Sequence, residues 1–207
     1  MSRFTGIHVS AALLARARRY EDDATSELCR LFAPPVYTLA ARILADRAQA
    51  DDVVQETLVQ MLNGLADFRG EASLATWVRR IAVSRCLMHQ RTAWEQRRTG
   101  LDTVAELATP GDGIEQRVLL GDALATALEQ LSDTARTVVW LHDVEGYTHK
   151  EIAALTGRSV SFSKSSLARA HKQLRGELKA EAPPGAAPRA AAPTTTPQVT
   201  ARLVAEV

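Results

Sequence analysis

Two stretches of the chain are rich in arginine and lysine, the side chains that bind phosphate groups. Residues 79–98 carry six arginines against the single acid Glu95, and Trp77 lies just before them. Aromatic rings beside a cationic track suit single-stranded nucleic acid, because the rings stack on bases while arginines follow the backbone. The alternative is that Trp77, Ile81 and Met88, which share helical spacing, are simply core residues.

The second basic stretch, residues 158–179, carries six lysines and arginines against one acid, Glu177. Such an imbalance is what contacts to the phosphates of a DNA duplex require. The alternative is a solvated basic helix in a plain bundle.

An acidic patch lies in the N-terminal half of the chain, before the first basic stretch. Its members are Asp51, Asp52, Gln55 and Glu56. Nucleic acid would be repelled there, so the patch indicates a protein partner with basic residues. The alternative is a solvated helix start, where acids interact favourably with the helix dipole.

The pair His142-Asp143, with His89 elsewhere, is also found in metal-dependent phosphohydrolases. That chemistry needs further ligands converging on the metal, and the sequence shows no second cluster of carboxylates and histidines. We therefore expect no enzyme activity, no metal and no cofactor.

Helical periodicity runs through the elements that must position these residues, and no strand pattern stands out. Ser10 is expected to cap a helix over 11–20, and Pro34-Pro35 is expected to break the chain after a helix over 25–32. Further helices are expected over 48–64, 74–98, 118–131 and 134–146. Residues 98–115 contain Pro110, Gly111 and Gly113 and are expected to form a linker.

The segment after the linker predicts a helix-turn-helix. Thr148 and Glu151 have the spacing of a capping box, Gly157 supplies the turn, and Ser159 can cap the last helix. Ala153 is small enough for the helices to cross. The shared core is expected to contain Ile152, Leu155, Val160 and Leu167. Residues 180–207 are rich in Ala, Pro and Thr and are expected to be disordered.

Composition is typical of an all-α protein with two small helical bundles. The 207 residues are 46% apolar and only 5% aromatic, and the formal net charge of +1 hides the local segregation described above. Cys29 and Cys86 form neither a disulfide framework nor a zinc site, and are expected to be small buried side chains. The sequence has no apolar run long enough to cross a bilayer, so we expect a cytoplasmic protein without membrane insertion.

Three segments carry the most specific patterns: ADDVVQETL (50–58), FRGEASLATWVRRIAVSRC (68–86) and LHDVEGYTHKEIAALTG (141–157). In this order, with a linker between the second and third, they resemble extracytoplasmic-function (ECF) sigma factors of bacterial RNA polymerase. The resemblance covers 13–179. It implies sigma region 2 at 10–97, a linker at 98–115 and sigma region 4 at 116–179.

The resemblance implies core RNA polymerase and promoter DNA as partners, with an anti-sigma factor as a further candidate. The acidic patch would dock on the clamp coiled coil of the β′ subunit, and the second module would rest on the β flap. Contacts to the −10 element are implied for Phe68, Arg69, Ser73, Trp77, Arg80 and Ser84. Contacts to the −35 element are implied for Arg158, Ser159, Ser161, Phe162, Lys164, Ser165, Ser166, Arg169 and Lys172.

The last helix departs from the family pattern. Members commonly read SVGTVKSRLxRAR, whereas residues 159–171 read SVSFSKSSLARAH. Ser163 replaces a valine, so we expect lost packing of about 1 kcal/mol or more, with Phe162 filling the gap. Ser166 replaces a basic residue and His171 an arginine. Losing a bidentate guanine contact removes ~1–3 kcal/mol of discrimination, so an altered −35 preference is expected.

A stand-alone helix-turn-helix regulator remains the second hypothesis. It would bind duplex DNA without polymerase and would have no need for the acidic patch or for the aromatic loop around Phe68. Ser84 stands where family members often have asparagine, so the base preference in the −10 element stays open.

Overall fold

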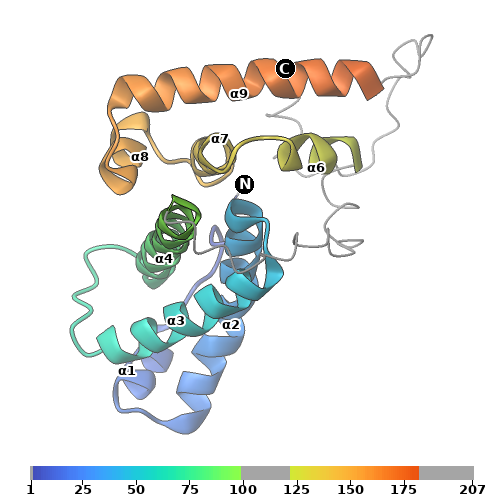
Figure 1. Ribbon diagram of the computed structural model, residues 1–207. Coiled ribbons are helices and arrows are strands. Elements are labelled where there is room, and N and C mark those ends of the chain that lie inside the picture. Colours follow the sequence, from blue (N-terminus) through green and yellow to red (C-terminus); the bar gives the residue numbers. More distant parts are fainter. Residues whose placement is uncertain (1, 99–121, 182–207) are drawn as a thin grey trace. The chain divides into compact units, whose positions relative to one another are not determined.

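A computed structural model describes residues 2–98 and 122–181 (Figure 1). The chain divides into two compact units, Ser2–Ala108 and Thr109–Val207. Within the described residues all regular structure is helical, as the sequence predicts. None of the described helices combines the length and the apolar character needed to cross a membrane. The predicted linker, the start of the helix expected from residue 118, and the predicted tail beyond 181 lie outside the described residues.

The N-terminal unit is a bundle of four helices around one core. They are α1 (Ala11–Arg18), α2 (Asp22–Leu44), α3 (Arg47–Gly64) and α4 (Leu74–Arg98). Helices α2, α3 and α4 pack against one another, and α1 packs on α2. The fully buried side chains include Leu28, Phe32, Leu39 and Ile43 from α2, Val53 and Met61 from α3, and Val78 from α4.

Helix α2 corrects one prediction. Pro34 and Pro35 lie inside this helix and do not break it. Interior prolines remove backbone hydrogen bonds and destabilise a helix by ~3 kcal/mol or more. Here the buried face is continuous through the prolines: Phe32, Pro35, Val36 and Leu39 are all buried. Burial of each large apolar side chain contributes about 1.5–3 kcal/mol, which is enough to offset the cost of the prolines and to keep α2 a single helix.

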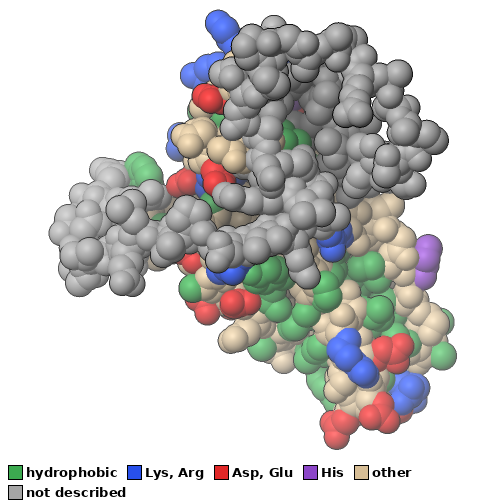
Figure 2. Space-filling view, turned by 90° about the vertical axis from the view of Figure 1, so that its right-hand side faces the viewer, with side chains coloured by type: hydrophobic (Ala, Val, Ile, Leu, Met, Phe, Trp, Pro, Cys, Tyr) green, Lys and Arg blue, Asp and Glu red, His purple; other side chains and the backbone are tan. Residues whose placement is uncertain are grey.

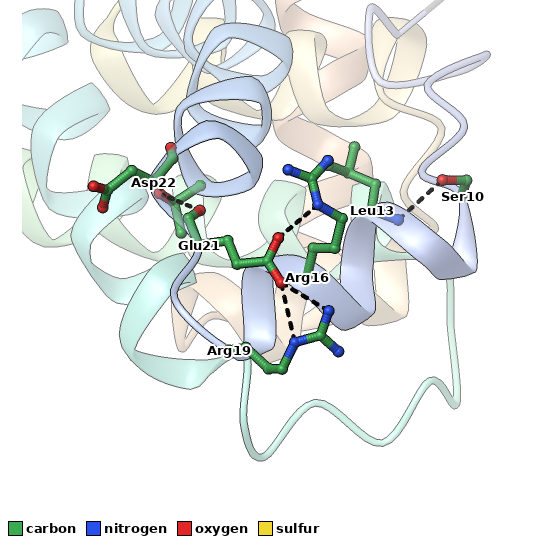
Figure 3. Close-up of polar contacts among 7 residues, drawn as sticks. Ser10, Leu13, Arg16, Arg19, Glu21 and Asp22 are labelled. Atoms are coloured by element: carbon green, nitrogen blue, oxygen red, sulfur yellow. Dashed lines mark hydrogen bonds and ion pairs between the residues drawn. The ribbon is translucent and has the colours of Figure 1, made fainter.

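The turn between α1 and α2 is fixed by one carboxylate (Figure 3). Glu21 accepts hydrogen bonds from Arg16 Nε at 2.7 Å and from Arg19 Nη2 at 2.7 Å. Both arginines lower the pKa of the Glu21 carboxyl through hydrogen bonds. Ser10 caps the other end of α1, where its Oγ accepts from the Leu13 amide at 3.1 Å, as predicted. Figure 2 likewise shows acidic and basic side chains intermixed at the lower end of this unit.

The two cysteines differ in burial. Cys86 lies in the core of the N-terminal unit, and burial raises the pKa of its thiol to about 12. Cys29 is only half-buried. The expectation of two buried cysteines is therefore confirmed for Cys86 and wrong for Cys29.

The C-terminal unit arranges short helices along one long helix (Figure 1). The short elements are α6 (Asp122–Glu129), α7 (Asp133–Val139), the π-helical turn η1 (Trp140–Val144) and α8 (His149–Thr156), and the long helix is α9 (Val160–Glu181). Helices α6, α7 and α8 each pack on α9. Leu141, Ile152 and Leu174 are fully buried and anchor this core.

The predicted caps of the C-terminal unit are confirmed. Thr148 and Glu151 form a complete capping box at the start of α8. Gly157 ends that helix with a φ of 67°, a left-handed conformation that favours glycine. Ser159 Oγ accepts from the Phe162 amide at 3.1 Å and so caps α9.

Two other predictions for this unit need correction. The expected single helix over 134–146 is α7 followed by the π-helical turn η1, which places His142 and Asp143 on a widened turn. Of the predicted helix-turn-helix core, Ile152 and Leu167 are buried, together with Ala153, but Leu155 is only half-buried and Val160 is 39% exposed. Val160 is the first residue of α9, and the residues of α9 that pack inward begin one turn later, at Ser163.

Candidate nucleic-acid and protein interfaces

The loop between α3 and α4 forms a pocket of about 420 Å³. Phe68, Arg69, Trp77 and Arg80, four of the residues predicted from sequence, line it. The rings of Phe68 and Trp77 lie 5.2 Å apart between centroids, with an interplanar angle of 37°. The pocket therefore combines an aromatic wall with two arginines and with the carboxylates of Asp67 and Glu71. Aromatic rings beside cationic side chains suit an unstacked base and its phosphate.

The other two predicted residues of this surface lie outside the pocket. Ser84 is exposed on α4, at helical spacing from Trp77 and Arg80. Ser73 is exposed, but its Oγ accepts from the Thr76 amide at 3.1 Å, so it caps α4. The alternative that Trp77, Ile81 and Met88 are core residues holds only for Ile81, since Trp77 is half-buried and Met88 is 45% exposed.

Two residues that the sequence analysis missed hold this pocket in shape. A Cβ at Gly64 would lie 2.8 Å from Trp77 Cη2, so only glycine allows the indole to lie against the end of α3. Arg18 of α1 donates from Nε to the Leu65 carbonyl at 3.1 Å and from Nη2 to the Phe68 carbonyl. A glycine at a helix end has an obvious capping explanation, and Arg18 lies 50 residues from Phe68, so neither gave a local signal.

The acidic patch lies on α3. Asp51, Asp52 and Gln55 are exposed. Glu56 is half-buried and lies between two basic residues of α4, 3.2 Å from His89 Nε2 and 3.6 Å from Arg85 Nη1. Arg85 also donates to Gln60 Oε1 at 2.8 Å. Glu56 thus joins α3 to α4, while the three remaining residues of the patch are exposed.

The predicted −35 residues lie in the turn before α9 and along α9 as far as Lys172. Seven of them are exposed: Arg158, Ser159, Ser161, Lys164, Ser165, Arg169 and Lys172. Phe162 is half-buried, and the Arg158 guanidinium lies 5.4 Å from the centre of its ring. The residue that contacts the Ser163 hydroxyl is His149, whose Nδ1 lies 3.0 Å from Ser163 Oγ, and the filling of the gap by Phe162 stays a prediction.

Ser166 corrects a prediction. It is only 6% exposed, and it shares the inner face of α9 with Leu167, Ala170 and Leu174. A side chain on this face points toward the core of the unit and away from a duplex, so Ser166 does not belong to the DNA-facing set.

His142 and Asp143 lie in a polar cluster with His149, His171 and Ser163. Within the described parts of the chain, no group of three or more His, Cys, Asp or Glu side chains is arranged to hold a metal ion. The ligand set that a metal-dependent phosphohydrolase needs is therefore not assembled by these residues.

Known proteins match both units. The family profile for Sigma-70 region 2 matches residues 28–96, and that for Sigma-70 region 4 matches residues 121–174. The chain is 28% identical to the RNA polymerase sigma-H factor of Pseudomonas aeruginosa, over 78% of this chain and 90% of that protein. It is also 28% identical to the ECF RNA polymerase sigma factor SigM of Mycobacterium tuberculosis, over 80% and 82% respectively.

A solved structure has the same fold. It is the sigma factor RpoE in complex with the anti-sigma factor NepR from Bartonella quintana, with a TM-score of 0.53 and 22% identity. The match covers 78% of this chain and 100% of that one. A stand-alone helix-turn-helix regulator would account for the second unit but not for the region 2 match. Since both matched regions belong to one kind of initiation subunit, this chain belongs to the extracytoplasmic-function sigma factors and recognises promoter DNA with core RNA polymerase.

Proposed function

We propose that the pocket between α3 and α4 captures one unstacked base of the −10 element during promoter opening. The observation that carries this proposal is the half-buried Phe68–Trp77 pair beside Arg80 in a pocket of about 420 Å³. Extruding a base from the duplex costs a few kcal/mol. Stacking on aromatic side chains returns about 1–3 kcal/mol per base, so one base in this pocket offsets much of that cost.

The remaining surfaces divide the work of recognition. The exposed lysines and arginines of α9 bind phosphates and base edges of the −35 element, while Ser159, Ser161 and Ser165 provide short hydrogen-bonding groups. Asp51, Asp52 and Gln55 dock on the clamp coiled coil of the β′ subunit. The second unit rests on the β flap. We place the protein in the cytoplasm, where core polymerase acts, and expect it to act by binding, without catalysis of its own.

An anti-sigma protein is a further proposed partner. The support is that RpoE from Bartonella quintana was solved with the anti-sigma factor NepR. Co-purification from the native cells, followed by mass spectrometry, tests this partner. Recovery of core polymerase subunits alone, under inducing and non-inducing conditions, would contradict it.

Base capture is tested with permanganate, which oxidises unpaired thymines, on a promoter bound by holoenzyme. We expect Trp77→Ala and Arg80→Ala to reduce −10 reactivity strongly while holoenzyme assembly is unchanged. Arg91→Ala is the matched control, because Arg91 is an exposed arginine on the same helix outside the pocket. Equal loss in all three variants would mean that general positive charge, not the pocket, holds the strand.

A further inference from the structure

A chain of polar contacts crosses the C-terminal unit and ends on α9, the helix that carries the proposed −35 surface. The Asp143 carboxylate joins two histidines, with 2.8 Å from Oδ1 to His142 Nδ1 and 2.7 Å from Oδ2 to His171 Nε2. His142 stacks on His149, with ring centroids 4.5 Å apart and an interplanar angle of 21°. His149 Nδ1 in turn lies 3.0 Å from Ser163 Oγ. The cluster thus connects η1 and the start of α8 to two positions of α9.

Ser163 is the α9 residue of this cluster that contacts His149. Its side chain is on the inner face of α9 and only 1% exposed. A buried hydroxyl without a partner is destabilising, so Ser163 depends on His149 for its hydrogen bond. Lys164, an exposed member of the proposed −35 surface, is the next residue. The contact between His149 and Ser163 therefore fixes α9 directly behind its DNA-facing side chains.

The protonation states in the cluster follow from the contacts. Burial opposes the charge on Asp143, but hydrogen bonds from His171 and His142 outweigh it and lower the pKa of the carboxyl. Asp143 is therefore ionised and accepts from both rings. Burial, followed by the neighbouring His142 and Lys164, lowers the pKa of His149, against a smaller opposing effect of Asp143. His149 is therefore neutral near pH 7.

We propose that neutral His149 is a positioning residue for −35 recognition, holding α9 through Ser163 so that Lys164 and Arg169 meet the duplex. The proposal rests on the function proposed for α9. It also explains why serine is tolerated at a buried position of this helix: histidine and serine together form a hydrogen-bonded pair where an apolar residue would otherwise pack.

The proposal predicts an unusual dependence on pH. His149 is faced by His142 and Asp143 from η1 and by Lys164 from α9. A proton on His149 adds a second positive charge beside Lys164 and against the His142 ring, with only Asp143 opposing. Because the pKa of His149 is lower in the folded chain, the contribution of His149 to folding stability is present above the ordinary histidine value of 6.5. It is lost as pH falls below that value. Added positive charge near DNA would otherwise strengthen binding as pH falls.

The test measures the affinity of holoenzyme for a −35 duplex at about pH 8 and at a series of pH values falling through and below the ordinary histidine pKa of about 6.5, because the pKa of His149 is lowered. At the higher pH, His149→Ala and Ser163→Ala are each expected to weaken binding by roughly three- to tenfold, the equivalent of one hydrogen bond. Their combination should be no worse than either alone. His149→Asn offers a polar atom where histidine has Nδ1 and does not titrate, so it should restore most of the affinity.

The pH profile separates positioning from a purely structural role. The wild type should lose affinity relative to His149→Asn as pH falls, because a protonated His149 can still donate from Nδ1 to Ser163 Oγ but is repelled by Lys164 and His142, which displaces α9. Circular dichroism at each pH verifies that every variant is folded. Equal affinities of the wild type and His149→Ala at the higher pH, with only thermal stability changed, would overturn the proposal. A wild-type profile parallel to that of His149→Asn would also overturn it.

Arg169→Ala distinguishes this proposal from the one on which it rests. Arg169 is exposed on α9, and its Nε donates to the Ser165 carbonyl of the same helix at 3.2 Å. If Arg169→Ala and Lys164→Ala bind the duplex like the wild type, α9 is not the −35 reader. If both variants lose binding while the His149 variants do not, only the positioning role is wrong.

Discussion

Replacing Gly64 by alanine tests how closely the base-capture pocket depends on the end of α3. The added Cβ would lie 2.8 Å from Trp77 Cη2 and 2.9 Å from Cζ2, closer than carbon atoms approach in folded proteins. The backbone of α3 is fixed by its packing on α2 and α4, so the indole has to move. Trp77 is half-buried and contacts Phe68, so its displacement also disturbs the aromatic wall.

The effect on stability should be small and the effect on DNA large. Overpacking destabilises by ~1–3 kcal/mol, while replacing a helical glycine by alanine returns about 1 kcal/mol. The net change in the free energy of unfolding is thus between about zero and ~2 kcal/mol. Losing the lower part of the ~1–3 kcal/mol of base stacking corresponds to roughly five- to tenfold weaker binding of a single-stranded −10 oligonucleotide. Competition binding with holoenzyme measures this loss, and thermal unfolding of the free chain measures stability.

Gly176→Ala is the matched control for this substitution. Gly176 lies in α9, and a Cβ there would have nothing within 4 Å. We expect this variant to be as stable as the wild type or more stable, with unchanged −10 binding. If Gly64→Ala binds the oligonucleotide like Gly176→Ala, the indole does not need its present position, and the reasoning about the pocket is refuted.

Three further predictions concern the remaining contacts. Arg18→Ala should weaken −10 binding several-fold by releasing the Leu65 and Phe68 carbonyls. Arg18→Lys should restore only part of the binding, because lysine lacks the guanidinium fork. Competition binding measures both variants, and full restoration by lysine would mean that charge alone matters. Asp52→Arg should abolish assembly with core polymerase in a pull-down, whereas Asp23→Arg, the same change at an exposed residue of α2, should not. Equal effects of the two variants would mean that the acidic patch is not the docking surface. Thr148→Ala should destabilise the C-terminal unit by ~1 kcal/mol in thermal unfolding through loss of the capping box, and an unchanged melting temperature would contradict that role of the cap.

Features fixed by neighbouring residues could be predicted from the sequence. The cap at Ser10, the capping box of α8 and the turn at Gly157 each follow from residue types at fixed spacing, and all three are present. The pocket-lining residues could be named because they belong to a specific family segment. The continuity of α2 could not be predicted, because the burial that compensates for two prolines comes from α3 and α4 and has no local trace.

Side chains that act across elements were the ones missed or misplaced. Arg18 reaches a loop distant in sequence, and Ser163 finds its partner in His149 of another helix. The family pattern predicts Ser166 on the DNA surface, but the helical phase of α9 turns it inward. The role of a residue that departs from a family pattern therefore depends on its packing in the folded unit, which the pattern does not contain.

The central claim, that the α3–α4 pocket holds a base of the opened promoter, is tested most directly by crosslinking from inside it. Thr76 lines the pocket and can be replaced by a photoreactive phenylalanine derivative in holoenzyme on its own promoter. We predict crosslinks concentrated on a single base of the non-template strand in the −10 element, appearing only when the promoter is open. Crosslinks spread equally over both strands of closed duplex, or confined to polymerase subunits, would contradict the claim.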